Sequence, residues 1–333
     1  MSTKVSIIIP VFNSKKYISQ CIESVLKINF NSYDIIIVDN CSTDGSLDLI
    51  RQFKSKKIKI IKNTKNFGQT YSLNKGIKIS NSKYIAIMDS DDICLPNRIK
   101  SSYEFLENKK SFILVGGKSN TIDSDGNLLK KRFFSTNEII IKNRLFLENP
   151  ISHTTIMFDR KKILLLGGYT KKYNYSQDLD LYNKIISNGY RINNLNEHFT
   201  LVRKHPLSQS NKNQTIQQKE KLKIIQNNIK RYKGANKIIH IRDIEKLLFN
   251  KNDSFNSMTN IRQVKLFSTF IDYFFSNKDI KIYIIALLFS QKNHFKKFFK
   301  FKIIYKYVLI NKFKLKFSET KLRLFKSILK IIF

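Results

Sequence analysis

The chain has 333 residues, more than the ~100–200 residues of an average domain, so we expect one large domain with a smaller appendage. Hydrophobic residues make up 42% and aromatic residues 12%, with 10 Gly and 4 Pro, which excludes a fibrous or an intrinsically disordered protein. The formal net charge of +36 favours polyanionic partners such as anionic lipid, nucleic acid or acidic glycan.

The first third of the chain alternates between short apolar runs and helical patterns, as is typical of parallel βαβ units. The apolar runs predict strands at Val5–Ile9, Asp34–Val38, Ile58–Ile61, Lys83–Met88 and Phe112–Val115. The segments between them predict helices at Lys15–Leu26, Ser46–Phe53, Gln69–Ile79 and Leu95–Leu106. We therefore expect an open, doubly wound and mostly parallel α/β sheet that binds ligands at the carboxyl ends of its strands.

The pattern changes after Gly116, where a tight-turn signal at Asp123–Asn127 predicts a hairpin. The elements expected from there on are strands at Lys118–Ile122, Leu128–Phe134 and His153–Phe158, helices at Lys161–Leu166 and Asp178–Ser187, and strands at Tyr190–Leu195 and Phe199–Arg203. We expect these elements to complete a first domain that spans residues 1–210.

Residues 211–333 carry 28 Lys/Arg against 7 Asp/Glu, and their apolar residues recur at helical spacing, which predicts a basic α-helical extension. Lysines alternate with apolar residues from Phe295 to Phe317, as in amphipathic helices that lie on anionic lipid. A helix packed on the first domain with solvated lysines explains this stretch equally well. An AT-rich genome, which enriches Lys, Asn and Ile together, is a further explanation of the charge.

No segment is predicted to span a membrane, since the longest apolar run near the C-terminal end, Ile282–Phe289, has 8 residues where ~20 are needed. Val5–Ile9 stops at Pro10 and indicates a strand rather than a signal peptide. Three widely spaced cysteines favour a reducing compartment. We therefore expect a cytoplasmic protein, with the basic extension as a candidate for peripheral attachment to the inner face of the cell membrane.

The most informative segment is an acidic cluster, Asp89, Asp91 and Asp92, at the end of the predicted strand Lys83–Met88. Clustered carboxylates repel one another unless a cation neutralises them. Mg²⁺ and Mn²⁺ bind through one or two carboxylates while a substrate diphosphate completes the shell. We expect Asp89 and Asp91 to contact a ribose and a metal, with solvated side chains as the alternative, and Asp92 to cap the next helix.

A second acidic group, Asp39, follows the predicted strand Asp34–Val38. A carboxylate at a strand end can accept a hydrogen bond from a nucleobase or from a ribose hydroxyl. Taken alone, Asp39 is explained equally well as a turn residue.

Together, these motifs resemble the family 2 glycosyltransferases of GT-A fold. The segments that carry the resemblance are, in order, 5–13, 38–45, 66–68, 74–76, 88–92, 150–153, 167–169, 177–180 and 203–205. The resemblance covers about residues 4–210 and implies inverting transfer from a nucleotide-sugar, with a UDP-sugar favoured, to a hydroxyl of a glycan or lipid-linked acceptor. It places the reaction in cell-surface polysaccharide synthesis, lipopolysaccharide included.

The same resemblance implies roles for individual donor-side residues. Pro10, Phe12 and Asp39 would line the nucleoside pocket, with Asp39 reading the base. Asp89 would contact the ribose, and Asp91 would hold Mn²⁺ or Mg²⁺ on the diphosphate.

A further group of residues would act around the donor diphosphate. Asn66, Gly68 and Asn74 would belong to the donor-binding loop and helix, although an ordinary helix N-terminus with a capping Asn explains them too. Arg203 and His205 would stabilise charge on the leaving diphosphate, with His205 as a further metal ligand. Surface charge near a loop is the alternative for both.

Inversion needs a general base within reach of the acceptor hydroxyl, and the resemblance assigns this role to Asp178. The family commonly has Glu just before this Asp, whereas the chain has Gln177, which weakens support from a second carboxylate. Asp180 is the next candidate for the base. His153 is explained equally well as a core histidine and as an acceptor contact.

Two other classes of protein compete with this interpretation. A polyanion- or nucleic-acid-binding module would use the basic extension, but the first domain has carboxylates where such a module needs basic residues, so no nucleic acid is expected. A nucleotidyltransferase would carry a glycine-rich basic loop after the first strand. The segment Pro10–Ser14 has neither Gly nor Arg.

Overall fold

The computed structural model describes residues 3–132, 134–145, 149–206, 208 and 213–231. A first compact unit comprises residues 1–228, and the second, 229–333, lies almost entirely outside the described residues. The first unit is built on one mixed sheet with the strand order β3-β2-β1-β4-β8-β6-β9-β5, and β7 pairs with β6. The basic stretch from Phe295 to Phe317 lies outside the described part of the chain.

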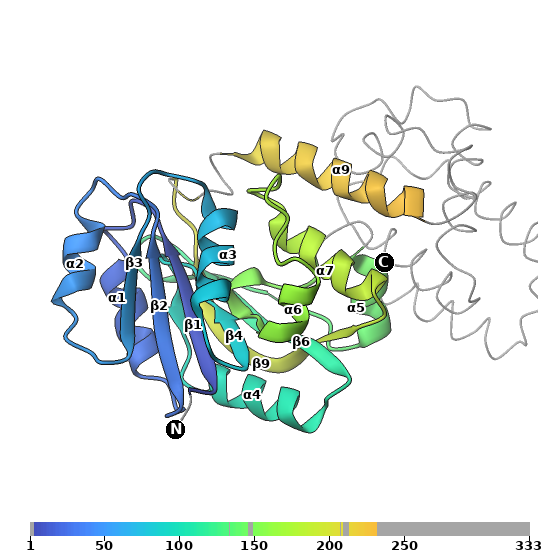
Figure 1. The fold of residues 1–333 in the computed structure, drawn as a ribbon, viewed down its shortest axis with the longest axis horizontal. Coiled ribbons are helices and arrows are strands. Elements are labelled where there is room, and N and C mark those ends of the chain that lie inside the picture. Colours follow the sequence, from blue (N-terminus) through green and yellow to red (C-terminus); the bar gives the residue numbers. More distant parts are fainter. Residues whose placement is uncertain (1–2, 133, 146–148, 207, 209–212, 232–333) are drawn as a thin grey trace, which may run out of the picture. The chain divides into compact units, whose positions relative to one another are not determined.

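The N-terminal half of the sheet is parallel, as expected (Figure 1). Its strands are β1 (Val5–Val11), β2 (Tyr33–Asp39), β3 (Ile58–Lys62) and β4 (Tyr84–Ile87). All residues of β1 are buried, because helices cover both faces of a parallel sheet. Val11 pairs with Asp39, so β1 and β2 end at the same edge.

Alternation along β1 divides the core into two layers. Ile8 packs in the layer of α3, whereas Ile7 and Ile9 pack in the layer of α1. The helices of this half are α1 (Ile18–Leu26), α2 (Ser46–Gln52), α3 (Gln69–Ile79) and α4 (Arg98–Asn108). The predicted α3 has the observed bounds, and the other three differ at their ends by one to three residues.

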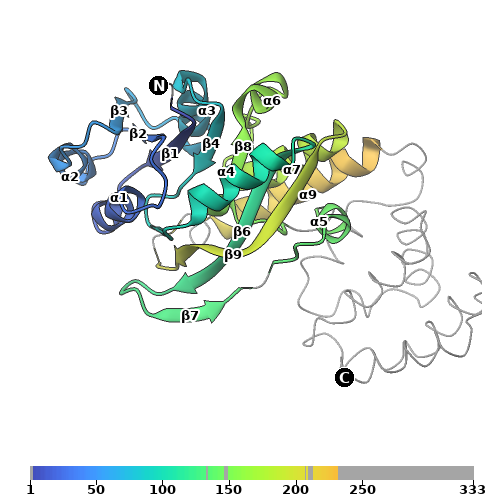
Figure 2. The same cartoon turned by 90° about the horizontal axis from the view of Figure 1, so that it is seen from below.

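The second half of the sheet is mixed. Its strands are β5 (Ile93–Cys94), β6 (Phe112–Ile122), β7 (Leu128–Lys131), β8 (Met157–Asp159) and β9 (Arg191–Arg203). β8 runs antiparallel to β4 and to β6, while β6 and β9 are parallel. The predicted hairpin forms between β6 and β7 and projects beyond the rest of the sheet (Figure 2).

Two pairs of predicted strands are single strands in the structure, β6 and β9. The glycines Gly116 and Gly117 interrupt the apolar pattern of β6, but the strand continues through them with shifts in register. A Cβ on Gly117 would lie 2.2 Å from Cδ2 of Phe199, so glycine is needed for the ring of β9 to pack there. The predicted strand at His153 also differs, because His153–Thr155 forms a 3-10 turn before β8.

The remaining helices are α5 (Glu138–Arg144), α6 (Arg160–Leu165), α7 (Gln177–Ser187) and α9 (Gln214–Arg231). Helix α5 was not predicted, while α9 agrees with the helical pattern expected after residue 211. Leu222, Ile224 and Ile225 of α9 are buried. Within the described ranges, no helix has the length and the apolar composition needed to cross a membrane.

Candidate active site

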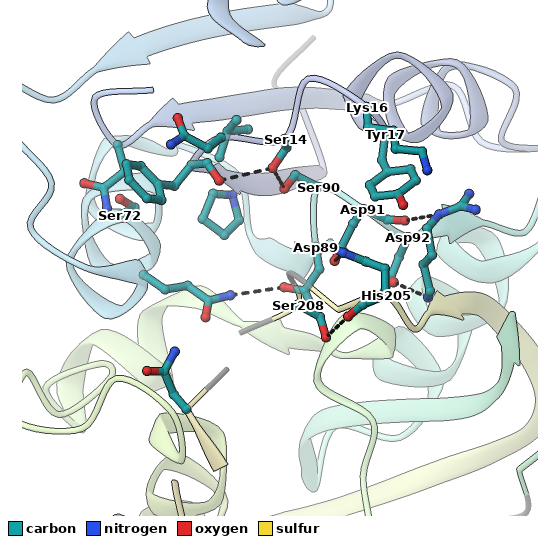
Figure 3. A pocket seen from close by; sticks show the side chains of 18 of the residues that line it. Ser14, Lys16, Tyr17, Ser72, Asp89, Ser90, Asp91, Asp92, His205 and Ser208 are labelled. Carbon is teal, nitrogen blue, oxygen red and sulfur yellow. Dashed lines mark hydrogen bonds and ion pairs between the residues drawn. The ribbon is translucent and has the colours of Figure 1, made fainter. Parts of the chain in front are cut away.

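An open cleft of about 1360 Å³ runs along the carboxyl ends of the parallel strands (Figure 3). Nine of the predicted site residues line it: Pro10, Phe12, Asn66, Gly68, Asp89, Asp91, Asp178, Arg203 and His205. Two others, Asp39 and Asn74, do not. The topology thus brings residues from positions 10 to 205 into one cleft, as expected for strand-end sites of α/β sheets.

Asp39 lies behind the wall of the cleft, next to the lining residue Asn40. Its side chain is fully buried, and Oδ1 accepts a hydrogen bond from the Ser42 backbone N–H at 3.2 Å. Oδ2 has no hydrogen-bond partner among the described residues. A buried, unpartnered carboxylate oxygen is costly unless a ligand or water supplies a donor.

The loop that leads into α3 is held by amide contacts. Asn66 Oδ1 accepts hydrogen bonds from Asn40 Nδ2 at 2.6 Å and from the Gly68 N–H at 2.9 Å. Gly68 has φ +86° and ψ 163°, a region open to glycine almost alone, and starts α3. Asn66 therefore shapes the loop, and Gly68 lets the backbone turn into the helix.

Asn74 has a structural role in place of the expected donor contact. Its Nδ2 donates to the Tyr169 carbonyl at 2.8 Å, and its Oδ1 accepts from the Tyr169 N–H at 2.9 Å. Both polar ends of the amide are therefore occupied by one backbone unit. Asn74 joins α3 to the segment that leads toward α7.

The acidic cluster has a buried cation beneath it, Arg98, whose side chain is 1% exposed. Its guanidinium donates to the carbonyls of Ile87 and Ile156. Burial, followed by the neighbouring charge of Asp91, raises the pKa of Asp89 to about 7, and Arg98 partly opposes this shift. Sequence reasoning missed Arg98 because a lone arginine in an amphipathic helix carries no motif.

Asp91 and His205 meet across the cleft, with Oδ2 and Nε2 3.0 Å apart (Figure 3). The His205 ring also packs on Tyr17, with ring centroids 4.8 Å apart. One carboxylate and one imidazole suit a divalent ion whose other ligands are phosphate and water. Among the described residues, no three His, Cys, Asp or Glu side chains are grouped as a metal site.

Asp92 does not cap α4, which corrects the expectation from sequence. Its Oδ1 accepts from the Arg203 backbone N–H at 2.8 Å, and the N-cap of α4 is Asn97. The Arg203 guanidinium donates to the carbonyls of Asp91, Asp123 and Ser124 and to Gln20. Arg203 thus holds the acidic loop to the hairpin and uses four of its five guanidinium N–H groups to do so.

Asp178 lies in the first turn of α7 and lines the cleft. Asn149 Nδ2 donates to its Oδ2, and the Leu179 N–H donates to its Oδ1 at 2.8 Å. Burial raises the pKa of Asp178 above that of an ordinary carboxyl group, an effect that His153 partly opposes. A raised pKa suits a general base near neutral pH.

Asp180, the second candidate base, is occupied elsewhere. Its Oδ2 accepts from Thr170 Oγ1 at 2.5 Å and lies 3.8 Å from Lys184 Nζ. His153 lines the cleft, and its Nε2 lies 2.9 Å from Tyr169 Oη. Asp180 is therefore structural, while His153 is both partnered and next to the cleft.

Gln177 is 5% exposed and reaches toward Gln69, with Nε2 and Oε1 3.4 Å apart. Gln69 Nε2 in turn donates to Asp89 Oδ1 at 3.2 Å. The two glutamines thus connect the start of α7 with the acidic cluster. Gln69 and Asn149 were not singled out from sequence, although both adjoin segments that were.

Several known proteins resemble this chain in sequence or in fold. A family model described as Glycosyl transferase family 2 matches residues 6–165. An uncharacterized glycosyltransferase of Methanocaldococcus jannaschii is 34% identical over 200 residues, which cover 58% of this chain and 68% of the relative. The Escherichia coli enzyme WfaP, a UDP-Glc:α-D-GlcNAc-diphosphoundecaprenol β-1,3-glucosyltransferase, is 33% identical over 201 residues, which cover 60% of this chain and 77% of WfaP.

Among solved structures, TarS 1–349 from S. aureus, in complex with UDP-GlcNAc, superimposes with a TM-score of 0.60. The match covers 91% of this chain and 89% of TarS 1–349, at 17% sequence identity. At this identity the likeness concerns the fold alone.

Proposed function

The chain belongs to glycosyltransferase family 2 and has the GT-A fold, and from this premise we propose that it transfers a sugar from a UDP-sugar to a hydroxyl group with inversion at the anomeric carbon. The observation that carries the proposal is the arrangement of one cleft. Asp89, Asp91 and His205 line its donor side, and Asp178 lines it from the start of α7.

The nucleoside would bind against Pro10 and Phe12 at the end of β1. Phe12 is 41% exposed, which leaves its ring available for contact with a base. The Oδ2 of Asp39, which is buried and has no partner among the described residues, would accept the N–H of uracil once the wall of the cleft adjusts to the nucleotide. Asp89 would accept from a ribose hydroxyl.

Asp91 and His205 would hold Mn²⁺ or Mg²⁺ together with the diphosphate oxygens. The pair fits this role because it combines a hard oxygen ligand with an imidazole at 3.0 Å and opens into the cleft. When bound, the metal would supply Lewis-acid stabilisation of the leaving diphosphate. The protein's own part is to hold the backbone of Asp91, through Arg203 Nε on its carbonyl at 3.0 Å, and to pair the carboxylate with His205.

Asp178 would accept the proton of the acceptor hydroxyl as its oxygen attacks the anomeric carbon and the C–O bond to the diphosphate breaks. The sugar then sits on the acceptor with inverted configuration, and the nucleoside diphosphate leaves with the bonding electrons. Asn149 and the Leu179 N–H hold the carboxylate in one orientation for this step. Because Gln177 is neutral, no second carboxylate adjoins Asp178 in the chain.

The acceptor would be a glycan or a lipid-linked sugar in the synthesis of a cell-surface polysaccharide. The support is the relative WfaP, whose name gives a diphosphoundecaprenol-linked acceptor and UDP-Glc as donor. The basic extension would then hold the enzyme near the anionic inner face of the membrane.

The test is nucleotide release with a panel of UDP-, GDP- and dTDP-sugars in Mn²⁺, in Mg²⁺ and in EDTA. We expect metal-dependent turnover with a UDP-sugar, and loss of metal-dependent UDP binding in Asp91→Asn by calorimetry. Asp125→Asn, which changes an exposed carboxylate of the hairpin turn, is the matched control. A well-folded wild type that neither binds UDP nor releases nucleotide from any donor would overturn the proposal.

A further inference from the structure

Helix α9 follows the family-matched segment and contacts the loop that leads into α7 (Figure 1). Glu220 of α9 accepts three consecutive backbone N–H groups of that loop. Oε1 accepts from Asn174 at 3.0 Å, and Oε2 accepts from Tyr175 and Ser176 at 2.9 Å each. Ser176 is the N-cap residue of α7, and it gives no side-chain cap to its own helix.

A second residue of α9 supports the same loop. Gln217 Nε2 donates to the Tyr175 carbonyl at 2.9 Å, and the Gln217 carbonyl accepts from Ser176 Oγ at 3.1 Å. The N–H groups of residues 174–176 and the Tyr175 carbonyl therefore find their partners in α9. Helix α9 thus holds residues 174–176 in place through hydrogen bonds.

The other side of the loop touches the donor half of the site. Thr70 Oγ1 of α3 donates to the Tyr173 carbonyl at 2.5 Å. The Asn174 side chain lies so close to Gly68 that a Cβ there would be 2.8 Å from Asn174 Oδ1. The loop is thus held between the donor-side turn and α9, and Asp178 follows it within two residues of Ser176.

We propose that Glu220 is a positioning residue for the general base: it fixes residues 174–176 and thereby the direction from which Asp178 meets the acceptor. The inference rests on the proposed function, since it assumes that Asp178 is the base. It also makes α9, the start of the basic extension, part of the catalytic unit, so the working domain extends past residue 210.

The carboxylate is suited to this task by its chemistry. It offers two acceptor oxygens and no donor, so it can take three N–H groups, whereas a glutamine places an NH₂ group against at least one of them. Its negative charge also lies before the N-terminus of α7, where the helix dipole favours an anion. An alanine would leave all three N–H groups unpaired.

The experiment compares Glu220→Gln and Glu220→Ala with wild type, and uses Glu104→Gln on the exposed face of α4 as the matched control. Three quantities are measured: kcat with the donor found for wild type, the Kd and stoichiometry of UDP binding, and amide hydrogen exchange of residues 174–176. UDP stoichiometry reports the folded fraction, so a loss of kcat per binding site separates positioning from unfolding.

We expect kcat per UDP site to fall about 10-fold in Glu220→Gln and about 100-fold in Glu220→Ala, because small misplacements of a reacting group have effects of this order. The Kd for UDP should stay within twofold, exchange at residues 174–176 should rise in the same order, and Glu104→Gln should match wild type.

Faster exchange with kcat within twofold of wild type would overturn the positioning role. Equal losses of UDP sites and of activity would overturn it in favour of a purely structural role. If wild type turns over no donor, the proposed function itself fails, an outcome distinct from both.

Discussion

The two halves of the site are built in different ways. The proposed nucleotide half, at the ends of β1, β2 and β4, places its residues directly on the ends of parallel strands, so that Val11 and Asp39 lie opposite each other by the register of the sheet alone. The proposed acceptor half, at the start of α7, places one carboxylate, Asp178, through side chains from elsewhere in the chain. Asn149 is 29 residues away in sequence, and Glu220 binds Ser176 from 44 residues away.

Because of this difference, substitutions in the two halves should have different effects. Backbone topology positions the nucleotide half, and many buried residues share that task. A few polar contacts position Asp178, the proposed base, so a single substitution there should change the transfer rate while nucleotide binding persists. Changes in the acceptor half should therefore lower kcat, and changes in the donor half should weaken nucleotide or metal binding.

The largest effect on the transfer rate is expected from a substitution of Asp178, the proposed base. Asp178→Asn should lower transfer by about 10²- to 10⁴-fold, the usual contribution of a general base, with the Kd for UDP unchanged. Asp180→Asn, two residues further on, should keep transfer within a few-fold because Asp180 bonds Thr170 rather than substrate. Steady-state rates together with calorimetry for UDP measure both. If Asp180→Asn lost more transfer activity than Asp178→Asn, Asp180 would be the better candidate for the base and Asp178 would be structural.

The pH dependence of transfer tests the environment of the base. As the proposed base, Asp178 would have to be ionised to accept a proton, and burial raises its pKa. The acid limb of kcat should therefore lie above the ordinary range of a carboxyl group, with kcat falling about tenfold per pH unit below that apparent pKa. Asn149→Ala removes a donor to the carboxylate and should move the limb to higher pH. A limb that moved to lower pH would contradict this assignment.

Gly68 lies where the two halves meet, and Gly68→Ala should disturb both. The backbone at φ +86° should cost about 1–3 kcal/mol with a Cβ, and contact with Asn174 should add to this. Gly189→Ala is the control, since Gly189 has φ +80° but open space around it. Chemical unfolding should give Gly68→Ala a lower free energy of unfolding than Gly189→Ala. Adding Asn174→Ala to Gly68→Ala should reduce this difference. Equal stability of the two glycine variants would show that the contact is unimportant.

The smallest expected effect lies far from the cleft, at Glu107. Its carboxylate binds Lys110, Lys83 and Tyr84, which lower its pKa from 4.5 to about 2. Its stabilising contribution is therefore present above pH 4.5 and lost as the pH falls toward 2. Because these groups are partly exposed, Glu107→Gln should destabilise by less than about 1 kcal/mol at pH 7. A Tm difference from wild type that persisted at pH 2 would contradict the ion-pair explanation.

The part of the cleft at the strand ends was predictable because its signals are local. A buried apolar strand followed at once by polar residues predicts a strand-end site, and this pattern located Asp89, Asp91 and Pro10 in the cleft. The helix bounds of α3 followed in the same way from its periodicity. Local patterns did not reveal that the Asn74 side-chain amide hydrogen-bonds the Tyr169 backbone, since Asn74 looks like an ordinary helix residue and Tyr169 like an ordinary loop residue.

By itself, the sequence determined the parallel half, its helices and the order of the motifs, because hydrophobic periodicity and strand-end residues act over short distances. Only the tertiary structure decided that β6 and β9 are continuous strands, that Arg203 pins the acidic loop, and that Glu220 holds the approach to Asp178. These features depend on contacts between residues far apart in the chain. Such contacts carry no periodic signal, because each is a single pair of groups brought together by the fold.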